Sequence, residues 1–313
     1  MTAEQIGADT TGLHAPEALE SSETHQAAPE TRTDGTGQLI LGGTPIGNLQ
    51  DASERLRAAL ASADIIAVED TRKLRTLAAG LGVHTSGRVL VNHDHNEEAR
   101  SAQLVEAVAA GQHVLLLSDA GMPTISDPGY VAASAVAQAN LPVTVIPGPS
   151  AALTALALSG LPTGRFTFEG FLARKGSERS RRLRSLADEE RTMIFYESPH
   201  RTAATLADFA QAFGSERRAV VCRELTKLHE EVIRGSLADL VAWVEETQIR
   251  GEIVLVVEGA PAPEAPEAED VLSQVLARVE AGERLKSACA AVAAESGVSK
   301  RDLYEAALAA RNS

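Results

Sequence analysis

Loops of small and polar residues follow several of the short apolar runs in this 313-residue sequence. The loops are Gly42–Asn48, Glu69–Arg72, Ser118–Gly129, Pro147–Ala151 and Glu197–Arg201. A single loop of this kind would be explained as a turn, because Gly, Pro, Asn and Asp dominate turns. Several such loops after the strands of a parallel sheet would lie at one edge of that sheet, where open α/β sheets bind ligands. The pattern therefore predicts a binding site for a small polar ligand.

The loops also limit the kind of ligand. The sequence contains no Gly-x-Gly-x-x-Gly motif and no phosphate-binding loop that ends in Gly-Lys-Ser or Gly-Lys-Thr, so a nicotinamide dinucleotide or a nucleoside triphosphate is not expected. Gly42 and Gly43 would let backbone approach a ligand closely, and Asp119 could accept hydrogen bonds from a sugar or an amino group. His93 and His95 lack a third ligand, so we expect no metal. The residues alone indicate a small polar cofactor other than a dinucleotide.

The elements that must position these loops alternate between two periods. Short apolar runs such as Leu39–Leu41 and Ile253–Val257 alternate with helix-period stretches such as Arg201–Phe213. This alternation predicts an α/β fold with largely parallel sheets. It extends from Gln38 to Gly259, which is long enough for two α/β lobes, and Gly160 and Pro162 favour a boundary there.

The sequence divides into five segments. Residues 1–36 form an acidic tail without an apolar period, expected to be disordered. Residues 37–160 and 161–260 form the two lobes, residues 261–270 a linker, and residues 271–313 a small helical domain. Two helices joined at Gly297 are typical of a helix-turn-helix. Many such pairs never contact nucleic acid, so the residues alone favour a helical cap.

Charge and cysteine usage narrow the function only slightly. The net charge of −14 opposes a nucleic-acid partner, but residues 1–36 hold seven acids and one base, and Ala260–Asp270 holds four acids. Local patches decide phosphate binding. The segment Arg174–Arg184, with six bases and one acid, predicts either a solvated helix face or a phosphate contact. Cys222 and Cys289 are far apart, which predicts buried packing residues in a reducing compartment.

The sequence gives no indication of export or of a membrane span. It has no apolar run of about eighteen residues, the minimum for a membrane helix. The N-terminal residues are acidic and polar and lack the apolar core of a signal peptide. We therefore expect a cytoplasmic protein without a membrane partner.

Four motifs resemble those of the tetrapyrrole methylase superfamily. They are Gly43-Thr44-Pro45-Ile46-Gly47-Asn48, Ser118-Asp119-Ala120-Gly121-Met122-Pro123, Asp127-Pro128-Gly129 and Pro147-Gly148-Pro149-Ser150. The resemblance implies a two-lobed tetrapyrrole-methylase-like fold that binds S-adenosyl-L-methionine in a cleft between the lobes, and a homodimer. It extends from Gln38 to Gly259.

Further motifs resemble one branch of this superfamily, which methylates the 2′-hydroxyl of a cytidine in the decoding region of 16S ribosomal RNA. They are Glu69-Asp70-Thr71-Arg72, His95-Asn96-Glu97, and Phe195-Tyr196-Glu197-Ser198-Pro199-His200-Arg201. Lys300-Arg301-Asp302-Leu303-Tyr304 is similar to the terminal helix-turn-helix of that branch, which reverses the interpretation of the C-terminal helices as a cap. The implied substrate is 16S ribosomal RNA or the assembled small ribosomal subunit.

The resemblance also assigns roles to residues. The implied cofactor-binding residues are Thr44, Pro45, Gly47, Asn48, Asp119, Gly121, Met122, Pro123, Pro149, Ser150, Ala151, Tyr196, Glu252 and Ile253. The implied RNA-binding residues are Arg72, His95, Asn96, Glu97 and Arg201, with Arg174, Lys175, Arg179, Arg181, Arg182, Arg184, Lys300 and Arg301 from the basic segment and the terminal helices. Arg72 and Arg201 could each bind a phosphate through two parallel hydrogen bonds.

The implied reaction needs a base. The hydroxyl oxygen must lie in line with the methyl carbon and the sulfur, at about 3 Å from the carbon. A ribose hydroxyl is a poor acid, so a base that takes its proton would speed the attack. The candidates are His200, Glu197, Asp70 and Glu69. For His200, an equally good interpretation is that it caps the helix after Pro199.

Two alternatives remain open at this point. The first is another enzyme of the same superfamily, which would methylate a precorrin or a side chain of a translation factor. The terminal helices and the basic segment oppose a small tetrapyrrole. The second is a ribosomal RNA-binding assembly factor that keeps the cofactor site without catalysis, which the complete set of motifs opposes.

Overall fold

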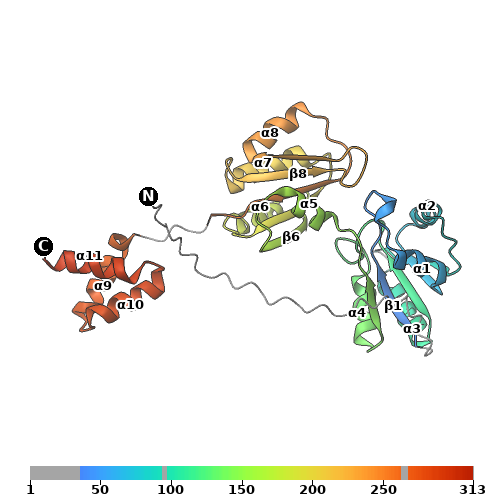
Figure 1. Cartoon of the computed structure of the whole chain (residues 1–313), viewed down its shortest axis with the longest axis horizontal. Coiled ribbons are helices and arrows are strands. Elements are labelled where there is room, and N and C mark those ends of the chain that lie inside the picture. Colours follow the sequence, from blue (N-terminus) through green and yellow to red (C-terminus); the bar gives the residue numbers. More distant parts are fainter. Residues whose placement is uncertain (1–35, 94–96, 262–266, 313) are drawn as a thin grey trace, which may run out of the picture. The chain divides into compact units, whose positions relative to one another are not determined.

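The computed structural model describes residues 36–93, 97–261 and 267–312. All but the last residue of the predicted acidic tail, half of the predicted linker, and the candidate residues His95 and Asn96 lie outside the described residues. The chain divides into two compact units, several of whose helices and strands are labelled in Figure 1. The first ends at Gly148, and the second begins at Pro149 and also includes Ile46–Asn48.

The first unit is built on a parallel sheet with the strand order β3-β2-β4-β1-β5. The strands are β1 (Gln38–Gly42), β2 (Ile65–Val68), β3 (Arg88–Val91), β4 (His113–Leu117) and β5 (Val143–Ile146). Because all of these strands are parallel, their carboxyl ends lie at one edge, as the sequence predicts. Neighbours such as β1 and β4, far apart in the chain, lie side by side, so loops distant in sequence meet there.

Helices cover both faces of this sheet. They are α1 (Glu54–Ser62), α2 (Thr71–Leu81), α3 (Glu97–Ala109) and α4 (Tyr130–Gln138), with a short 3₁₀ helix η1 (Leu49–Asp51). Alternate residues of β1 point to opposite faces: Ile40 packs with Leu56 of α1, whereas Leu39 packs with Leu104 of α3. Burial on both faces explains why β2 is apolar throughout.

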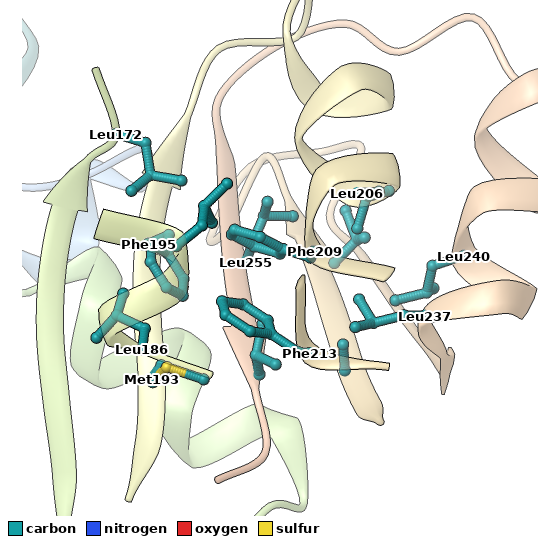
Figure 2. Packing of buried hydrophobic residues seen from close by; sticks show 14 of the residues in the cluster. Leu172, Leu186, Met193, Phe195, Leu206, Phe209, Phe213, Leu237, Leu240 and Leu255 are labelled. Atoms are coloured by element: carbon teal, nitrogen blue, oxygen red, sulfur yellow. The ribbon is translucent and has the colours of Figure 1, made fainter. Parts of the chain in front are cut away.

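The second unit contains a mixed sheet with the order β6-β7-β10-β8-β9. Its strands are β6 (Phe166–Phe171), β7 (Thr192–Glu197), β8 (Arg218–Arg223), β9 (Glu231–Ser236) and β10 (Ile253–Val257). β10 runs antiparallel to both β7 and β8. One face packs on α6 (Ser177–Ser185), α7 (Thr202–Phe213) and α8 (Leu237–Glu246), and Figure 2 shows the core formed there, in which the rings of Phe195 and Phe209 are 4.7 Å apart.

The opposite face of this sheet packs on α5 (Ala151–Ser159). The buried side chains of α5, Ala152, Ala155 and Leu156, join Ile194 of β7 in one hydrophobic cluster. This packing places α5 in the second unit, so the boundary at Gly148 lies before the predicted one near residue 160. The helix ends at Gly160, whose φ of 73° is a left-handed C-cap, and this stop was the signal taken as a domain boundary.

The C-terminal region is helical, as the sequence predicts. It consists of α9 (Ala268–Glu280), α10 (Leu285–Ser296) and α11 (Lys300–Asn312), which share a hydrophobic cluster of their own. Gly297, with a φ of 77°, forms the turn between α10 and α11. Across the three described stretches of the chain, no helix is long and apolar enough to cross a membrane.

Candidate functional site

The predicted loops of the first unit do converge at the carboxyl edge of its sheet. Thr44, after β1, pairs with Gly121, after β4, through backbone bonds of 2.8 and 3.2 Å. A pocket at this edge is lined by Thr44, Pro45, Val68, Asp70, Lys73, Leu74, Leu77, Leu117, Ser118 and Asp119. Residues that follow β1, β2 and β4 therefore surround one small hollow, which is lined both by apolar side chains and by polar groups such as Asp119.

Two glycines let the loops after β1 and β5 touch. A Cβ added to Gly43 would lie 2.6 Å from the backbone nitrogen of Gly148, and a Cβ added to Gly148 would lie 2.8 Å from backbone atoms of Gly43. Both distances are shorter than real Cβ contacts. The sulfur of Met122 would be only 2.7 Å from the Gly43 Cβ. Glycine is thus required at both positions by close packing of backbone on backbone.

Asp70 is held by its neighbours on α2. Its side chain caps the helix by accepting from the backbone nitrogen of Arg72 at 2.8 Å, and it also binds the Arg72 guanidinium at 2.7 Å. These hydrogen bonds lower the pKa of Asp70 to about 2. A carboxylate that holds its proton so weakly is a poor general base, and the Arg72 side chain is engaged here by a carboxylate of the protein.

Asp127 is a member of this edge for which the sequence suggested no role. Burial, followed by the nearby charges of Glu69 and Asp119, raises the pKa of the Asp127 carboxyl to about 6. Lys73 partly offsets this effect, and it forms an ion pair of 2.9 Å with Asp119. The sequence did contain one indication of this cluster. Glu69, Asp119 and Asp127 all follow strands whose carboxyl ends a parallel sheet brings to one edge.

The loop that carries Asp127 is anchored by Glu97, which corrects one prediction. Glu97, the first residue of α3, is buried, and its Oε1 accepts from the backbone nitrogens of Gly129 at 2.6 Å and Val131 at 3.0 Å. Gly129 stands at the N-cap of α4 and has no side chain with which to cap it. Glu97 caps α4 from a distance and is not an exposed RNA contact.

Glu97 matters the more because the loop is strained. Thr124 and Ser126 have φ values of 75° and 61°, which residues other than glycine rarely adopt. Such conformations persist only where the surrounding structure fixes them, and they are common at functional sites.

In the second unit, the predicted base Glu197 is buried. Only 1% of its side chain is exposed. It accepts from the backbone nitrogen of Ser198 at 2.8 Å and from the Thr205 hydroxyl at 2.6 Å, and it pairs with Arg201 at 3.3 Å. Both carboxylate oxygens are therefore engaged at the end of β7, so Glu197 is a structural residue and not an accessible base.

Arg201 and His200 also differ from expectation. The Arg201 guanidinium donates to the Leu172 carbonyl at 2.8 Å and also pairs with Glu197. It is therefore not available to bind a phosphate through two parallel hydrogen bonds. The helix α7 begins at Thr202, and its N-cap is Arg201, so His200 does not cap it. His200 is exposed and keeps its place among the candidate bases.

The basic segment divides into buried and exposed residues. Arg179 is 8% exposed, and it binds Asp208 at 2.7 Å, the Thr205 hydroxyl at 3.0 Å and the Ala173 carbonyl at 3.2 Å. Arg182 forms an ion pair with the buried carboxylate of Glu169. The prediction that these two contact RNA is contradicted for Arg179 and weakened for Arg182. The remaining bases are exposed: Arg174, Lys175, Arg181 and Arg184.

The other cofactor candidates of the second unit lie at the edge where β6, β7 and β8 end. Gly47 and Asn48 pack on the loop after β8, where Asn48 donates to the Thr226 hydroxyl at 3.2 Å. Pro149 and Ser150 lead into α5, which begins at Ala151. The Tyr196 ring contacts Phe168 and Phe171 edge-on, at 4.9 and 5.6 Å between ring centres.

Two of these candidates offer less than expected. The Glu252 side chain pairs with Lys227 at 3.0 Å. Ile253 is buried in the core that faces α7 and α8, so its side chain cannot touch a ligand at the sheet edge.

On the terminal helices, Lys300 and Arg301 are both exposed, and Arg301 pairs with Glu305 at 3.0 Å. Within residues 36–93, 97–261 and 267–312, no group of three or more His, Cys, Asp or Glu residues could hold a metal ion. Cys222 and Cys289 are both buried, as predicted.

Comparison with known protein families shows to which family this chain belongs. Residues 38–241 match the family described as Tetrapyrrole (Corrin/Porphyrin) Methylases, and residues 263–311 match the family described as the RsmI C-terminal HTH domain. The chain therefore belongs to the tetrapyrrole methylase family.

Its relatives are more specific. The chain is 50% identical over 281 residues to a protein of Mycobacterium tuberculosis (strain ATCC 25618 / H37Rv) named ribosomal RNA small subunit methyltransferase I, covering 88% of this chain and 96% of that one. A protein of the same name from Escherichia coli O157:H7 is 42% identical over 286 residues, covering 91% and 98%. These matches confirm the resemblance seen in the motifs.

Solved structures confirm the fold. The chain aligns with a cobalt precorrin-4 methyltransferase with a TM-score of 0.54 and 17% identity, covering 74% of this chain and 98% of that one. It aligns with a diphthine synthase with a TM-score of 0.54 and 19% identity, covering 72% and 90%. At this identity the likeness concerns the fold alone. It supports the predicted α/β fold with two sheets, and the second family match supports the helical domain.

Proposed function

We propose that the protein is an S-adenosylmethionine-dependent methyltransferase of the small-subunit ribosomal RNA, and that it methylates the 2′-hydroxyl of a cytidine in 16S ribosomal RNA. The structural observation that carries the proposal is the convergence of the loops after β1, β2 and β4 at the carboxyl edge of the first sheet, around a small hollow. The names of relatives that match both the α/β units and the terminal helices support ribosomal RNA as the substrate.

The described residues fit such a cofactor. Gly43 and Gly148 allow the loops after β1 and β5 to pack backbone on backbone, because neither carries a side chain. Asp119, which lines the hollow, supplies a carboxylate that could accept hydrogen bonds from a sugar or an amino group. When bound, S-adenosylmethionine supplies an electrophilic methyl group on a positively charged sulfur. The acids at this edge would favour that charge.

The cofactor candidates form two sets, one in each unit. The first-unit set is Thr44, Pro45, Asp119, Gly121, Met122 and Pro123. The second-unit set is Gly47, Asn48, Pro149, Ser150, Ala151, Tyr196, Glu252 and Ile253. Binding of one cofactor by both sets stays a prediction, and Ile253 would take part only through its backbone.

A base must remove the hydroxyl proton, and we propose Asp127 for this role. Its raised pKa, about 6, lies closer to neutral pH than that of Asp70, about 2. A base works best when its pKa is near the working pH. Glu69, whose charge contributes to the raised pKa, would favour the proton on Asp127 once it has been transferred. His200 is the second candidate.

Mass spectrometry of the modified nucleosides tests the proposal. Purified protein, S-adenosylmethionine labelled in its methyl group, and small subunits from a strain that lacks the corresponding methyl group should yield labelled 2′-O-methylcytidine. Free 16S ribosomal RNA is a second substrate in the same experiment. Label on a base, on a protein or on a tetrapyrrole would replace the proposed substrate. RNA binding without label would favour the assembly-factor alternative.

We also propose a homodimer that acts in the cytoplasm. The edge strand β5 carries two exposed apolar side chains, Val143 and Val145, which a second copy could cover. Light scattering at several concentrations would show a mass of twice the chain, whereas a monomer mass throughout would contradict the dimer.

A further inference from the structure

The strand β6 contains a bulge that turns one aromatic side chain outward. Phe168 pairs with Ile194 of β7, but Gly170 pairs with Phe195, so Glu169 is an extra residue. Gly170 has a φ of 60°, a conformation that suits glycine. The bulge brings Phe171 opposite Tyr196, on the same face of the sheet as Phe168. Without the extra residue, Phe168 and Phe171 would point to opposite faces.

The side chain placed in this way is unusually exposed for its size. Phe171 is 56% exposed, although its ring contacts Tyr196 at 5.6 Å between centres. It lies at the carboxyl end of β6, at the same edge of the sheet as the Glu197–Arg201 run. Large aromatic rings at the surface mark interaction sites more often than scattered aliphatic residues do.

The backbone after Phe171 is fixed by two arginines. The Leu172 carbonyl accepts from Arg201 at 2.8 Å, and the Ala173 carbonyl accepts from Arg179 at 3.2 Å. Glu169, the extra residue of the bulge, pairs with Arg182 of α6. The side chains that the sequence assigned to RNA binding therefore hold the segment on which Phe171 stands.

The residues that follow this segment are basic and exposed. Arg174 and Lys175 come three and four residues after Phe171, and both are exposed. Arg181 and Arg184 of α6 are also exposed, but α6 packs on the face of the sheet opposite to the one that carries Phe168 and Phe171, so these two arginines do not belong to the group around Phe171. An exposed ring that is followed in the chain by two exposed cations suits an unpaired nucleotide: a base can stack on the ring, and the cations can bind the adjacent phosphates. A purely apolar partner would not explain the cations.

We infer that Phe171 is a stacking platform for an unpaired nucleobase of the RNA substrate, with Arg174 and Lys175 binding the adjacent phosphates. This inference rests on the proposed function. RNA recognition commonly uses bases that leave the helix and stack on aromatic side chains. The contact between Phe171 and Tyr196 places the platform beside a residue that we propose lines the cofactor site.

The test uses three variants of the full-length protein. Phe171→Ala removes the ring, Phe171→Trp keeps a ring, and Phe166→Ala removes a ring from the other end of the same strand. Phe166 is a matched control, because it is 39% exposed and lies on the same face as Phe168. For each variant, binding of a short single-stranded RNA is measured by fluorescence anisotropy, and binding of S-adenosylmethionine by calorimetry.

Loss of stacking on one base weakens RNA binding by between about 5-fold and 150-fold. We expect that loss for Phe171→Ala only, with unchanged S-adenosylmethionine binding in all three variants. RNA should also quench the fluorescence of the tryptophan introduced in Phe171→Trp, whereas it should not quench the one introduced in an additional fourth variant, Phe166→Trp. Equal RNA binding by Phe171→Ala and the parent would overturn the inference. Weaker S-adenosylmethionine binding by Phe171→Ala would also overturn it, because the platform would then hold the cofactor's adenine.

These readouts separate the inference from the proposed function. RNA binding that depends on Phe171 supports the platform even if the chemistry differs. If the parent methylates RNA and Phe171→Ala methylates it equally well, the proposed function stands and the role of Phe171 as a stacking platform is contradicted.

Discussion

Removal of the Glu97 carboxylate should destabilise the first unit and loosen the loop that carries Asp127. Two backbone donors at the start of α4, on Gly129 and Val131, depend on this carboxylate. A hydrogen bond to a charged group contributes about 1.5–3 kcal/mol, and a helix cap about 0.5–2 kcal/mol. Because the two bonds share one acceptor, we expect Glu97→Ala to lower the free energy of unfolding by roughly 3 kcal/mol.

The Gln variant makes this prediction sharper. Both bonds converge on a single oxygen, Oε1, so the amide oxygen of Glu97→Gln can accept both and should lose only roughly 1 kcal/mol, mainly the interaction of charge with the helix dipole. With a denaturation slope of about 2–3 kcal/mol per molar urea, the Ala variant should unfold about 1–1.5 M earlier than the parent. Methylation should fall in the same order, since the loop carries the proposed base.

The matched control is Glu98→Ala, which removes an exposed acid from the next position of α3. Its urea midpoint and methylation rate should equal those of the parent. A Glu97→Ala variant with the midpoint of the parent would refute the capping role. Equal losses in Glu97→Ala and Glu97→Gln would show that charge, and not the two hydrogen bonds, carries the effect.

Three further predictions follow from the same structure. Asp127→Asn should abolish methylation. It should also raise the free energy of unfolding at pH 8 and leave it unchanged near pH 4. The reason is that folding raises the pKa of the Asp127 carboxyl from 3.8 to about 6, so ionisation of this group at higher pH destabilises the folded protein. Urea denaturation at the two pH values checks this, and a lower stability of the variant at pH 8 would contradict it. Arg179→Ala should cost roughly 2 kcal/mol, because Asp208, Thr205 and the Ala173 carbonyl lose the buried guanidinium that binds them, whereas Arg181→Ala should unfold like the parent. Reversing Arg181 and Arg184 to Glu should lower the salt dependence of RNA binding by about one unit for each phosphate that is no longer bound and leave unfolding unchanged, which anisotropy across salt concentrations would reveal.

The sequence predicted the edge of the first sheet because a parallel sheet imposes it. When strands run in one direction, the loops after them must gather at one end, whatever the details of packing. This rule brought Thr44, Gly121 and Asp119 together correctly. It also contained Asp127, but no local pattern shows that a carboxyl will be partly buried beside two others.

Side chains with tertiary partners were harder to predict. Glu97 caps a helix that begins 33 residues later in the chain, at Tyr130, and nothing near Glu97 indicates it. Arg179 did carry a signal that the charge run hid. It stands four residues before Leu183 and seven before Leu186, so helical periodicity places it on the buried face. Charge alone suggested solvent, whereas periodicity indicated the interior.

The contact between Gly43 and Gly148 has a consequence for how this protein can vary. Each glycine occupies the space that a side chain on the other would need. A larger residue at one position could be accommodated only by a smaller residue at the other, and none is smaller than glycine. Substitution at either site must instead separate the ends of β1 and β5, where Gly43 donates to the Ile146 carbonyl at 2.9 Å. Thr44, the next residue, would be drawn away from Gly121. A substitution at one glycine therefore cannot be suppressed by a second substitution at the other. A genetic search for suppressors of Gly43→Ala should yield changes elsewhere in the two loops, or no suppressor at all.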